Sequence, residues 1–475
     1  MLSSANSMNE LFASACNASG LRSETEVLDW VKSRAQNNRY SVKLQALDKL
    51  KGWGFDPVTG NLAHASGKFF RFEGLDVQIT SGAVQCWQQP ILNQPEIGIL
   101  GFIAQRFNGV LHLLVQAKME PGNINFIQIS PTVQATRSNY TQAHGGNRPA
   151  FIEYFLDQND GRVLVDQLQS EQGTRYLRKR NRNLIVQMPD DFSLSHSEDF
   201  IWVTVGQLQR LMRFPNLVHL DCRSILGSLS YQVTGQQKIQ CSKLPKIKFS
   251  EKVRNSICAD DEEALSDMPA VLSWLTRLKC QIEVSTRLLP LNEVAGWSLT
   301  DGVIKHDSGQ FFSVVGVEVT ASNREVAGWC QPLICSIDGG IIGMASQMKK
   351  GVLHFLVQAR VEPGLIDIVE LAPTVQCTPT NYLDGLHSPL PAFVEMFQHV
   401  SQAELRFDST LSDEGGRFYH SQQRHLVIEL DASLDVALPA DYCWMTLRQI
   451  QEFARFSNLV NIELRSILAC LSPAD

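Results

Sequence analysis

The chain has 475 residues, of which 44% are hydrophobic and 19% are charged, and its formal net charge is −7. This length predicts two or three domains, and the composition is that of an ordinary globular protein. The acidic balance argues against a general nucleic-acid binder, and no stretch approaches the roughly 18 apolar residues of a membrane span.

The 11 cysteines are scattered, without a CxxC pair and without histidines at the spacing of a zinc site. We therefore expect reduced thiols, as in a cytoplasm. The first residues lack the basic start and the apolar run of a signal peptide. Together these features predict a soluble, cytoplasmic protein.

In chain order, the sequence predicts a flexible arm, a first module, a linker and a second module. The arm, residues 1–24, is rich in Ser, Asn and Ala. The first module spans 25–230 and opens with a helix that carries Trp30. The linker, 231–261, has no counterpart after the second module, which spans 262–475.

An internal repeat defines the two modules. The segment GVLHLLVQAKMEPG at 109–122 returns as GVLHFLVQARVEPG at 351–364, an offset of 242. Shorter matches surround it, such as HASGKFF with HDSGQFF and SEQGTRY with SDEGGRF. In each copy helices flank a strand-rich centre, so the predicted fold class is α+β.

The repeated segment has the period of a β-strand. One face, formed by alternate residues from Leu111 to Met119, is apolar and predicts contact with a core. The turn at Pro121–Gly122 then leads to a returning strand at 126–130. The opposite face is either exposed to water or part of a binding surface, and both interpretations stay open. Its members in the first copy are His112, Leu114, Gln116, Lys118 and Glu120.

Several motifs of catalysis are absent from the sequence. The chain has no GxGxxG after a strand, no GxxxxGK[ST], no GxSxG and no HExxH. Nothing in it indicates a nicotinamide, a bound triphosphate, a serine nucleophile or a zinc ion. We therefore expect no cofactor.

Polar side chains gather around the repeated hairpin. Gln, Asn and Tyr at fixed spacing suit an uncharged polar ligand such as a sugar or a base, and Arg and Lys suit phosphates. Any one of them alone is more often an ordinary surface or capping residue. The ligand-binding candidates in the first module are His112, Gln116, Gln134, Thr136, Arg137, Ser138, Asn139, Arg148, Arg175, Arg178 and Arg182. The candidates for a second pocket are Gln358, Arg360, Glu362, Gln376, Thr378, Asn381, Tyr382 and Arg417.

The paired motifs QAKMEPGN…SPTVQATRSNY and QARVEPG…APTVQCTPTNY, with SEQG and SDEGGRF downstream, resemble those of the NDP-hexose 2,3-dehydratases of deoxysugar biosynthesis. The resemblance runs from about Trp30 to Leu471. It implies two tandem Nudix-like modules, each a mixed sheet flanked by helices, in a homodimer that binds dTDP-linked sugars. It also implies loss of the C2 hydroxyl of a dTDP-linked 4-keto-6-deoxyhexose, with a downstream 3-ketoreductase as a partner. The carboxylate-rich box of true Nudix hydrolases is absent, which argues against pyrophosphate hydrolysis.

Such an elimination requires a base for the C3 proton, a donor to the enolate oxygen at C4 and an acid for the departing hydroxyl. Our hypothesis makes Glu120 or His144 the base or acid, Tyr140 the donor to the C4 oxygen, and Lys118 the cation that tunes the site. Lys118 and Glu120 lie two residues apart on one strand face, where a simple salt bridge is the alternative.

The two copies are not equivalent. Arg137 and His144 of the first copy are replaced by Pro379 and Leu386 in the second. We therefore expect catalysis in the first module and a second nucleotide-sugar pocket in the other. Two alternatives remain: a nucleotide-sugar binding protein without catalysis, and a Nudix-type hydrolase of nucleotide sugars.

Overall fold

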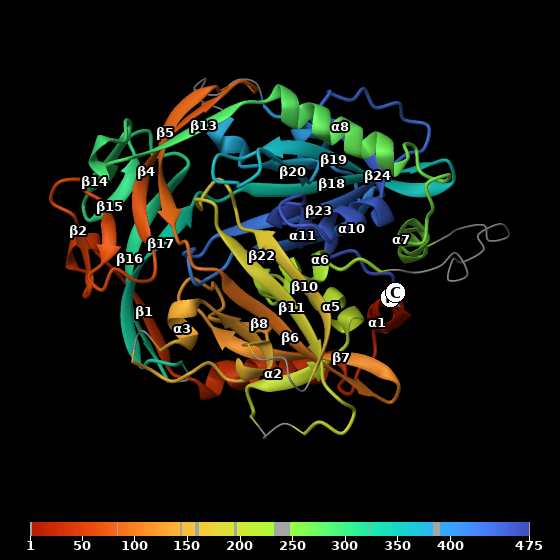
Figure 1. The fold of residues 1–475 in the computed structure, drawn as a ribbon, viewed down its shortest axis with the longest axis horizontal. Coiled ribbons are helices and arrows are strands. Elements are labelled where there is room, and N and C mark those ends of the chain that lie inside the picture. The colour runs from red at the N-terminus through yellow and green to blue at the C-terminus, as the bar shows by residue number, and fades with distance from the viewer. Residues whose placement is uncertain are drawn as a thin grey trace.

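The computed structural model describes residues 2–82, 84–142, 145–156, 161–193, 197–231, 248–322, 324–382 and 390–474. Within these ranges the chain has an α+β fold of two similar halves, each with a small and a large β-sheet (Figure 1). No helix in the described part is long and apolar enough to cross a membrane.

The first half runs from α1 to α6. Its helices are α1 (Leu2–Ala15), α2 (Glu24–Asn37), η1 (Leu47–Lys49), α3 (Arg137–Tyr140), α4 (Glu153–Leu156), α5 (Val205–Leu211) and α6 (Leu220–Gly227). Its strands are β1 (Tyr40–Gln45), β2 (Trp53–Phe55), β3 (Leu62–His64), β4 (Arg71–Ile79), β5 (Cys86–Asn93), β6 (Gly98–Phe107), β7 (Val110–Met119), β8 (Ile127–Pro131), β9 (Val133–Ala135), β10 (Arg162–Ser170), β11 (Arg180–Gln187) and β12 (Phe200–Val203).

The second half repeats this order from α7 to α11. Its helices are α7 (Phe249–Ile257), α8 (Met268–Gln281), η3 (Leu291–Glu293), η4 (Pro379–Tyr382), α9 (Val394–Gln398), α10 (Leu447–Ala454) and α11 (Ile462–Leu468). Its strands are β13 (Val284–Leu289), β14 (Trp297–Thr300), β15 (Val303–His306), β16 (Phe312–Ala321), β17 (Gly328–Ser336), β18 (Gly340–Lys349), β19 (Val352–Val361), β20 (Val369–Ala372), β21 (Val375–Cys377), β22 (Leu405–Ser412), β23 (Gln422–Leu430) and β24 (Tyr442–Thr446).

The large sheet of each half contains the repeated segment. In the first half the strand order is β10-β11-β6-β7-β12, with β8 on β7 and β9 on β6, and the β6–β11 pair is parallel. The predicted hairpin is confirmed, since β7 and β8 pair antiparallel with Met119 opposite Ile127. The alternate residues from Leu111 to Met119 are buried in the core, as their period predicts.

The small sheets exchange strands between the halves. β13 of the second half pairs with β4 of the first, and β1 of the first half pairs with β16 of the second. Each five-stranded small sheet of the described chain therefore has four strands from one half and one from the other, at the left of Figure 1. The halves consequently cannot separate without breaking two β-ladders.

The structure differs from the predicted flexible arm and linker. Residues 2–15, within the predicted arm, form α1, and its Ser14 hydroxyl donates to the carbonyl of Leu111 at 2.7 Å. α7, which falls within the predicted linker, is its counterpart, because Ser256 donates to the carbonyl of Leu353 at 2.6 Å. The repeat is hard to see here because few letters other than the serine are kept at the offset of 242. Residues 232–247 of the predicted linker lie outside the described residues.

Two buried arginines join the halves where α6 and α11 pack together, at the centre of Figure 1. Arg223, 1% exposed, donates to the carbonyl of Ser412 and the hydroxyl of Ser466. Arg465, 0% exposed, donates to the carbonyl of Ser170 at 2.5 Å. A buried guanidinium without hydrogen-bond partners would destabilise the fold. Each half therefore supplies hydrogen-bond acceptors for the buried arginine of the other half.

A second pair of contacts crosses between the halves at equivalent places. Gln128 donates to the Ser412 hydroxyl at 2.7 Å, and the Ser170 hydroxyl donates to Glu370 at 2.6 Å. Burial raises the pKa of the Glu370 carboxyl to about 7. Because a glutamine already occupies the equivalent position in the first half, Glu370→Gln is compatible with the fold.

We predict that Glu370→Gln reduces the loss of stability on going from pH 5 to pH 8. The pKa of the Glu370 carboxyl is about 7 in the folded protein, above its ordinary value of 4.5. Its contribution to the free energy of unfolding is therefore full below about pH 4.5 and is lost as the pH rises through 7. The difference amounts to roughly 1–3 kcal/mol. Melting temperatures at both pH values check this, and an equal fall in variant and wild type would contradict it.

Candidate active site

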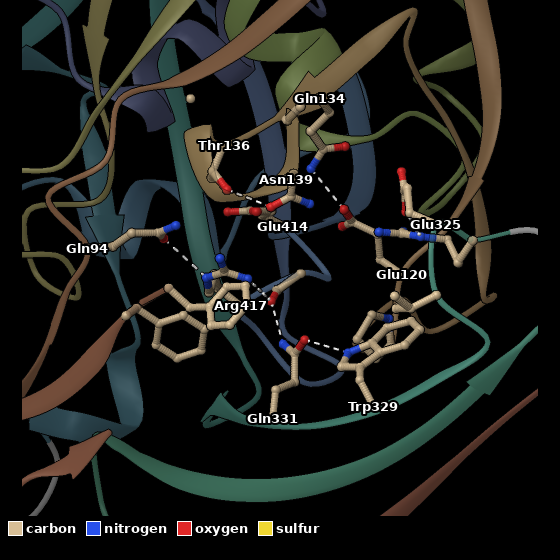
Figure 2. A pocket seen from close by; sticks show the side chains of 18 of the residues that line it. Gln94, Glu120, Gln134, Thr136, Asn139, Glu325, Trp329, Gln331, Glu414 and Arg417 are labelled. Atoms are coloured by element: carbon tan, nitrogen blue, oxygen red, sulfur yellow. Dashed lines mark hydrogen bonds and ion pairs between the residues drawn. The ribbon is translucent and has the colours of Figure 1, made fainter. Parts of the chain in front are cut away.

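A cavity of about 450 Å³ opens between the two halves (Figure 2). One part of its wall is aromatic, and the rest carries charged and amide side chains. The aromatic members are Trp53, His64, Phe69, Phe70 and Trp329. The charged and amide members include Gln94, Lys118, Glu120, Gln134, Asn139, Lys179, Asn181, Arg324, Glu325, Gln331, Glu414 and Arg417.

The turn of the β7–β8 hairpin brings the second half to this cavity. The Gly122 N–H donates to the carbonyl of Gly415 at 2.8 Å, and the His420 N–H donates to the carbonyl of Gly122 at 2.8 Å. A Cβ atom on Gly122 would lie 1.6 Å from the carbonyl oxygen of Phe418, so only glycine permits this approach. The loop between β22 and β23 is thereby held against the first half, with Glu414 and Arg417 in the cavity wall.

The same docking occurs in the opposite direction, and it corrects the predicted places of two arginines. Arg175 was expected in the first pocket and Arg417 in the second. Instead, Arg417 of the second half lies over the ring of Phe70 at 4.3 Å, and Arg175 of the first half lies over Phe312 at 4.4 Å. Each arginine contacts the other half because its loop is hydrogen-bonded to a glycine turn of that half. Gly364 is bonded in this way to the loop after β10, and Gly122 to the loop after β22.

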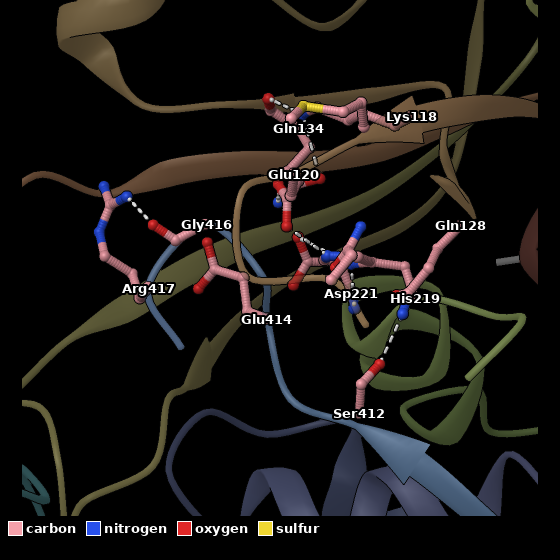
Figure 3. Close-up of polar contacts among 12 residues, drawn as sticks. Lys118, Glu120, Gln128, Gln134, His219, Asp221, Ser412, Glu414, Gly416 and Arg417 are labelled. Atoms are coloured by element: carbon pink, nitrogen blue, oxygen red, sulfur yellow. Dashed lines mark hydrogen bonds and ion pairs between the residues drawn. The ribbon is translucent and has the colours of Figure 1, made fainter. Parts of the chain in front are cut away.

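Glu120 is the centre of a hydrogen-bond network at the base of the cavity (Figures 2 and 3). Its Oε2 lies 2.7 Å from Nε2 of His219, and its Oε1 accepts from the Gln134 amide at 2.8 Å. Lys118 Nζ donates to the carbonyl and side-chain oxygens of Gln134, both at 3.1 Å. Glu120 is 3% exposed and His219 is 0% exposed, so the network is shielded from bulk water.

The charges of this network are set by burial and by one another. Burial disfavours the Glu120 carboxylate, but His219 and Lys118 outweigh this effect and hold the pKa of Glu120 well below its ordinary value. Burial and the nearby Arg324 lower the pKa of Lys118. Burial disfavours the charged form of His219, but Glu120 and Asp221 outweigh this effect and raise the pKa of His219, so that its Nε2 carries a proton for Glu120. An ionised carboxylate thus faces the cavity.

Further ionisable groups of the first half surround Glu414, which comes from the second half. Tyr176 donates its hydroxyl to Oε2 of Glu414 at 3.0 Å. Burial, together with the charge of Glu414, raises the pKa of Glu171 to about 7. Burial lowers the pKa of Lys179 to about 8. The carboxyl groups of Glu120 and Glu414, one from each half, therefore line the same cavity.

The structure brings together part of the predicted site. The polar strand face is enclosed, with His112, Leu114, Lys118 and Glu120 all buried, so the interpretation of a face exposed to water is wrong. The predicted residues that line the cavity are Lys118, Glu120, Gln134, Thr136 and Asn139.

Other predicted residues lie elsewhere in the described chain. Tyr140 packs against an apolar cluster of the large sheet, and Ser138 donates to Glu96 at 2.8 Å. His112 contacts the carbonyl of Val110 at 2.9 Å. The remaining candidates outside the cavity lining are Gln116, which is opposite Phe200 on β12, the exposed Arg137, Arg148 and Arg178, and Arg182, which is paired with Asp166. His144 lies outside the described residues.

The predicted residues of the second pocket form a related but altered network. Glu362 accepts from Arg360 at 3.1 Å and from Gln376 at 2.8 Å, and Asn461 donates to Gln376 at 2.8 Å. Asn461 occupies the position that His219 has in the first half. The other predicted members are Gln358, which donates to Asp441, Asn381, which accepts from the Phe311 N–H, and Thr378 and Tyr382 near the same turn.

Sequence reasoning missed His219, Asp221, Glu171 and Glu414. The one available signal was the difference between the copies, since the offset of 242 places Asn461 opposite His219 and Gln172 opposite Glu414. In the described part of the chain, no three His, Cys, Asp or Glu side chains converge as ligands for a metal ion.

The chain is similar to known proteins of one family. The model of a family described as NDP-hexose 2,3-dehydratase matches residues 24–229 and again 268–471. A relative from Saccharopolyspora spinosa is 42% identical over 96% of this chain and 93% of its own length, and one from Amycolatopsis orientalis is 42% identical over 97% and 93%. A third, from Streptomyces violaceoruber, is 41% identical over 93% and 95%. All three are named dTDP-4-dehydro-6-deoxy-alpha-D-glucopyranose 2,3-dehydratase.

Two matches of the family model, one in each half, and three relatives aligned over nearly their whole length show that this chain belongs to the NDP-hexose 2,3-dehydratases, lyases that remove water from a nucleotide-linked hexose.

Proposed function

We propose that the chain removes the C2 hydroxyl of dTDP-4-keto-6-deoxyglucose in the cavity between the halves, as a step of deoxysugar biosynthesis. The names of the three relatives support this substrate. The observation that carries the proposal is the Glu120–His219 pair, which lies at a cavity large enough for a sugar. The other half has Asn461 at the position of His219.

Glu120 is the proposed base for the C3 proton. That proton is acidic because the C4 ketone can accept the electron pair as an enolate, and Lys118 is the nearby cation that can stabilise the enolate oxygen. The enolate then expels the C2 hydroxyl, which leaves as water once it is protonated, and the resulting C2–C3 enol becomes the 3-ketone. Lys118 takes the role that the sequence assigned to Tyr140, because Tyr140 is not among the cavity-lining residues.

The rest of the cavity suits a nucleotide-linked sugar. Trp53 and Trp329 offer apolar ring surface for the base or for the apolar face of the hexose. Arg417 and Arg324 provide guanidinium groups for the diphosphate.

We also propose the finer assignments that the resemblance implies. Each half is a Nudix-like module, supported by its mixed sheet with helices, and the modules begin at α1 and α7. The enzyme is a cytoplasmic homodimer, and a 3-ketoreductase acts on its 3,4-diketo product. The alternatives are a nucleotide-sugar binding protein, which would release unchanged sugar, and a hydrolase, which would release nucleoside monophosphate.

We predict that Glu120→Gln lowers turnover at least about 100-fold, because an amide cannot take the C3 proton. Glu362→Gln, the equivalent change in the other half, is the matched control and should leave turnover within about twofold. Product formation from dTDP-4-keto-6-deoxyglucose, followed by mass spectrometry, is the measurement. Normal turnover by Glu120→Gln would reject the assignment.

We predict that His219→Asn shifts the acid limb of the kcat/KM profile to higher pH. His219 is the main group that holds the pKa of Glu120 low against its burial, so without it the Glu120 carboxyl is protonated at higher pH. Asn461 shows that asparagine fits this position, and Asn461→His serves as the control. An unshifted acid limb with reduced kcat would show that His219 acts otherwise than through the charge of Glu120.

A further inference from the structure

The mechanism above leaves the acid for the departing hydroxyl unassigned, and the cavity contains a second carboxyl group besides Glu120. Glu414 comes from the loop between β22 and β23 of the second half. Its Oε2 accepts the hydroxyl of Tyr176, whose side chain is fully buried, at 3.0 Å. This contact fixes one carboxyl oxygen and leaves Oε1 free to turn to the cavity.

The space between Glu414 and Glu120 is kept open by a glycine. A Cβ atom on Gly416 would lie 3.0 Å from Oε1 of Glu414 and 3.4 Å from Oε1 of Glu120. The two carboxylate oxygens therefore face a common space next to the backbone of Gly416 (Figure 3). An elimination with a separate base and acid requires two such groups, one near C3 and one near C2 of the sugar ring.

We call Glu414, Tyr176 and Gly416, together with Glu120 and His219, the polar corner of the cavity. The duplication indicates that the fold does not require these side chains at Glu414, Tyr176 and Gly416. The offset of 242 places Gln172 at the position of Glu414, Phe418 at that of Tyr176 and Thr174 at that of Gly416. The carboxyl, its hydroxyl donor and the open space are thus all absent from the equivalent loop of the other half. Because that loop makes the same backbone contacts, a purely structural role for the Tyr176–Glu414 contact is disfavoured.

We propose that Glu414 is the catalytic acid that protonates the departing C2 hydroxyl while Glu120 acts at C3. The assignment rests on the proposed dehydration. The proton on Glu414 moves to the C2 oxygen as the C2–O bond breaks with its electron pair, and water leaves. The electrons for the new C2–C3 bond come from the enolate formed at C3, so no oxidant or reductant takes part.

Neighbouring groups can supply and replace this proton. Burial and the charge of Glu414 together raise the pKa of Glu171 to about 7, so the Glu171 carboxyl can hold a proton near neutral pH. After the transfer, the Tyr176 hydroxyl stabilises the Glu414 carboxylate through the hydrogen bond that is already formed.

A change of leaving group tests the assignment, because fluoride departs with little need of an acid. The substrates are dTDP-4-keto-6-deoxyglucose and its 2-deoxy-2-fluoro analogue, with diketone formation measured for both and fluoride release for the second. Glu414→Gln should lose about 100-fold or more in kcat on the hydroxyl substrate and less than about tenfold on the fluoro substrate. Glu120→Gln should be impaired on both, because both need removal of the C3 proton.

The glutamine at position 172 indicates that Glu414→Gln will fold, and its melting temperature verifies this. Tyr176→Phe, which introduces the side chain that Phe418 has at the equivalent place, is a second variant and should show a smaller loss that is likewise confined to the hydroxyl substrate. Equal losses of Glu414→Gln on both substrates, or no loss on either, would overturn the role of Glu414 and leave the dehydration intact. A wild-type protein that releases neither water from the hydroxyl substrate nor fluoride from the fluoro substrate would overturn the proposed function and this assignment with it.

Discussion

The reciprocal docking of two glycine turns is the contact on which the site depends. Gly122 and Gly364 each meet the backbone of a loop from the opposite half, at a distance that no side chain would permit. Through this contact each half completes the other's polar corner. Exchanged strands and the buried Arg223 and Arg465 fix the same relative position, so the cavity that contains Glu120 is formed by both halves together.

Duplication gave this protein two equivalent corners, and their side chains have since diverged in charge. Where one half has Asn461 and the loop opposite it has Gln172, the other has His219 and Glu414. The Asn461 amide donates to Gln376, whereas His219 is hydrogen-bonded to Glu120 and Glu414 accepts from Tyr176. The histidine and the carboxyl can hold or transfer a proton, which the amides cannot. The two halves therefore share this backbone arrangement and differ in its ionisable side chains.

Local patterns in the sequence predicted much of this, and long-range pairing was beyond them. The period of 2 identified β7, its buried face and the Lys118–Glu120 pair, because alternation along a strand is a local property. The repeat identified two halves but could not say that β1 and β13 cross over, or that Arg417 serves the other half, since a duplicated motif fits either partner equally well. His219 escaped notice because a lone histidine before a helix has no distinctive spacing.

A crystal structure of the protein with a non-reacting dTDP-linked hexose bound would show directly which side chains contact the sugar ring. We expect the hexose to lie in the cavity between the halves, with C3 nearest to Glu120, C2 on the side of Glu414 and the nucleotide along the wall that carries Trp53, Phe70 and Arg417. A hexose bound elsewhere, with Glu120 and Glu414 both out of contact with its ring, would contradict it.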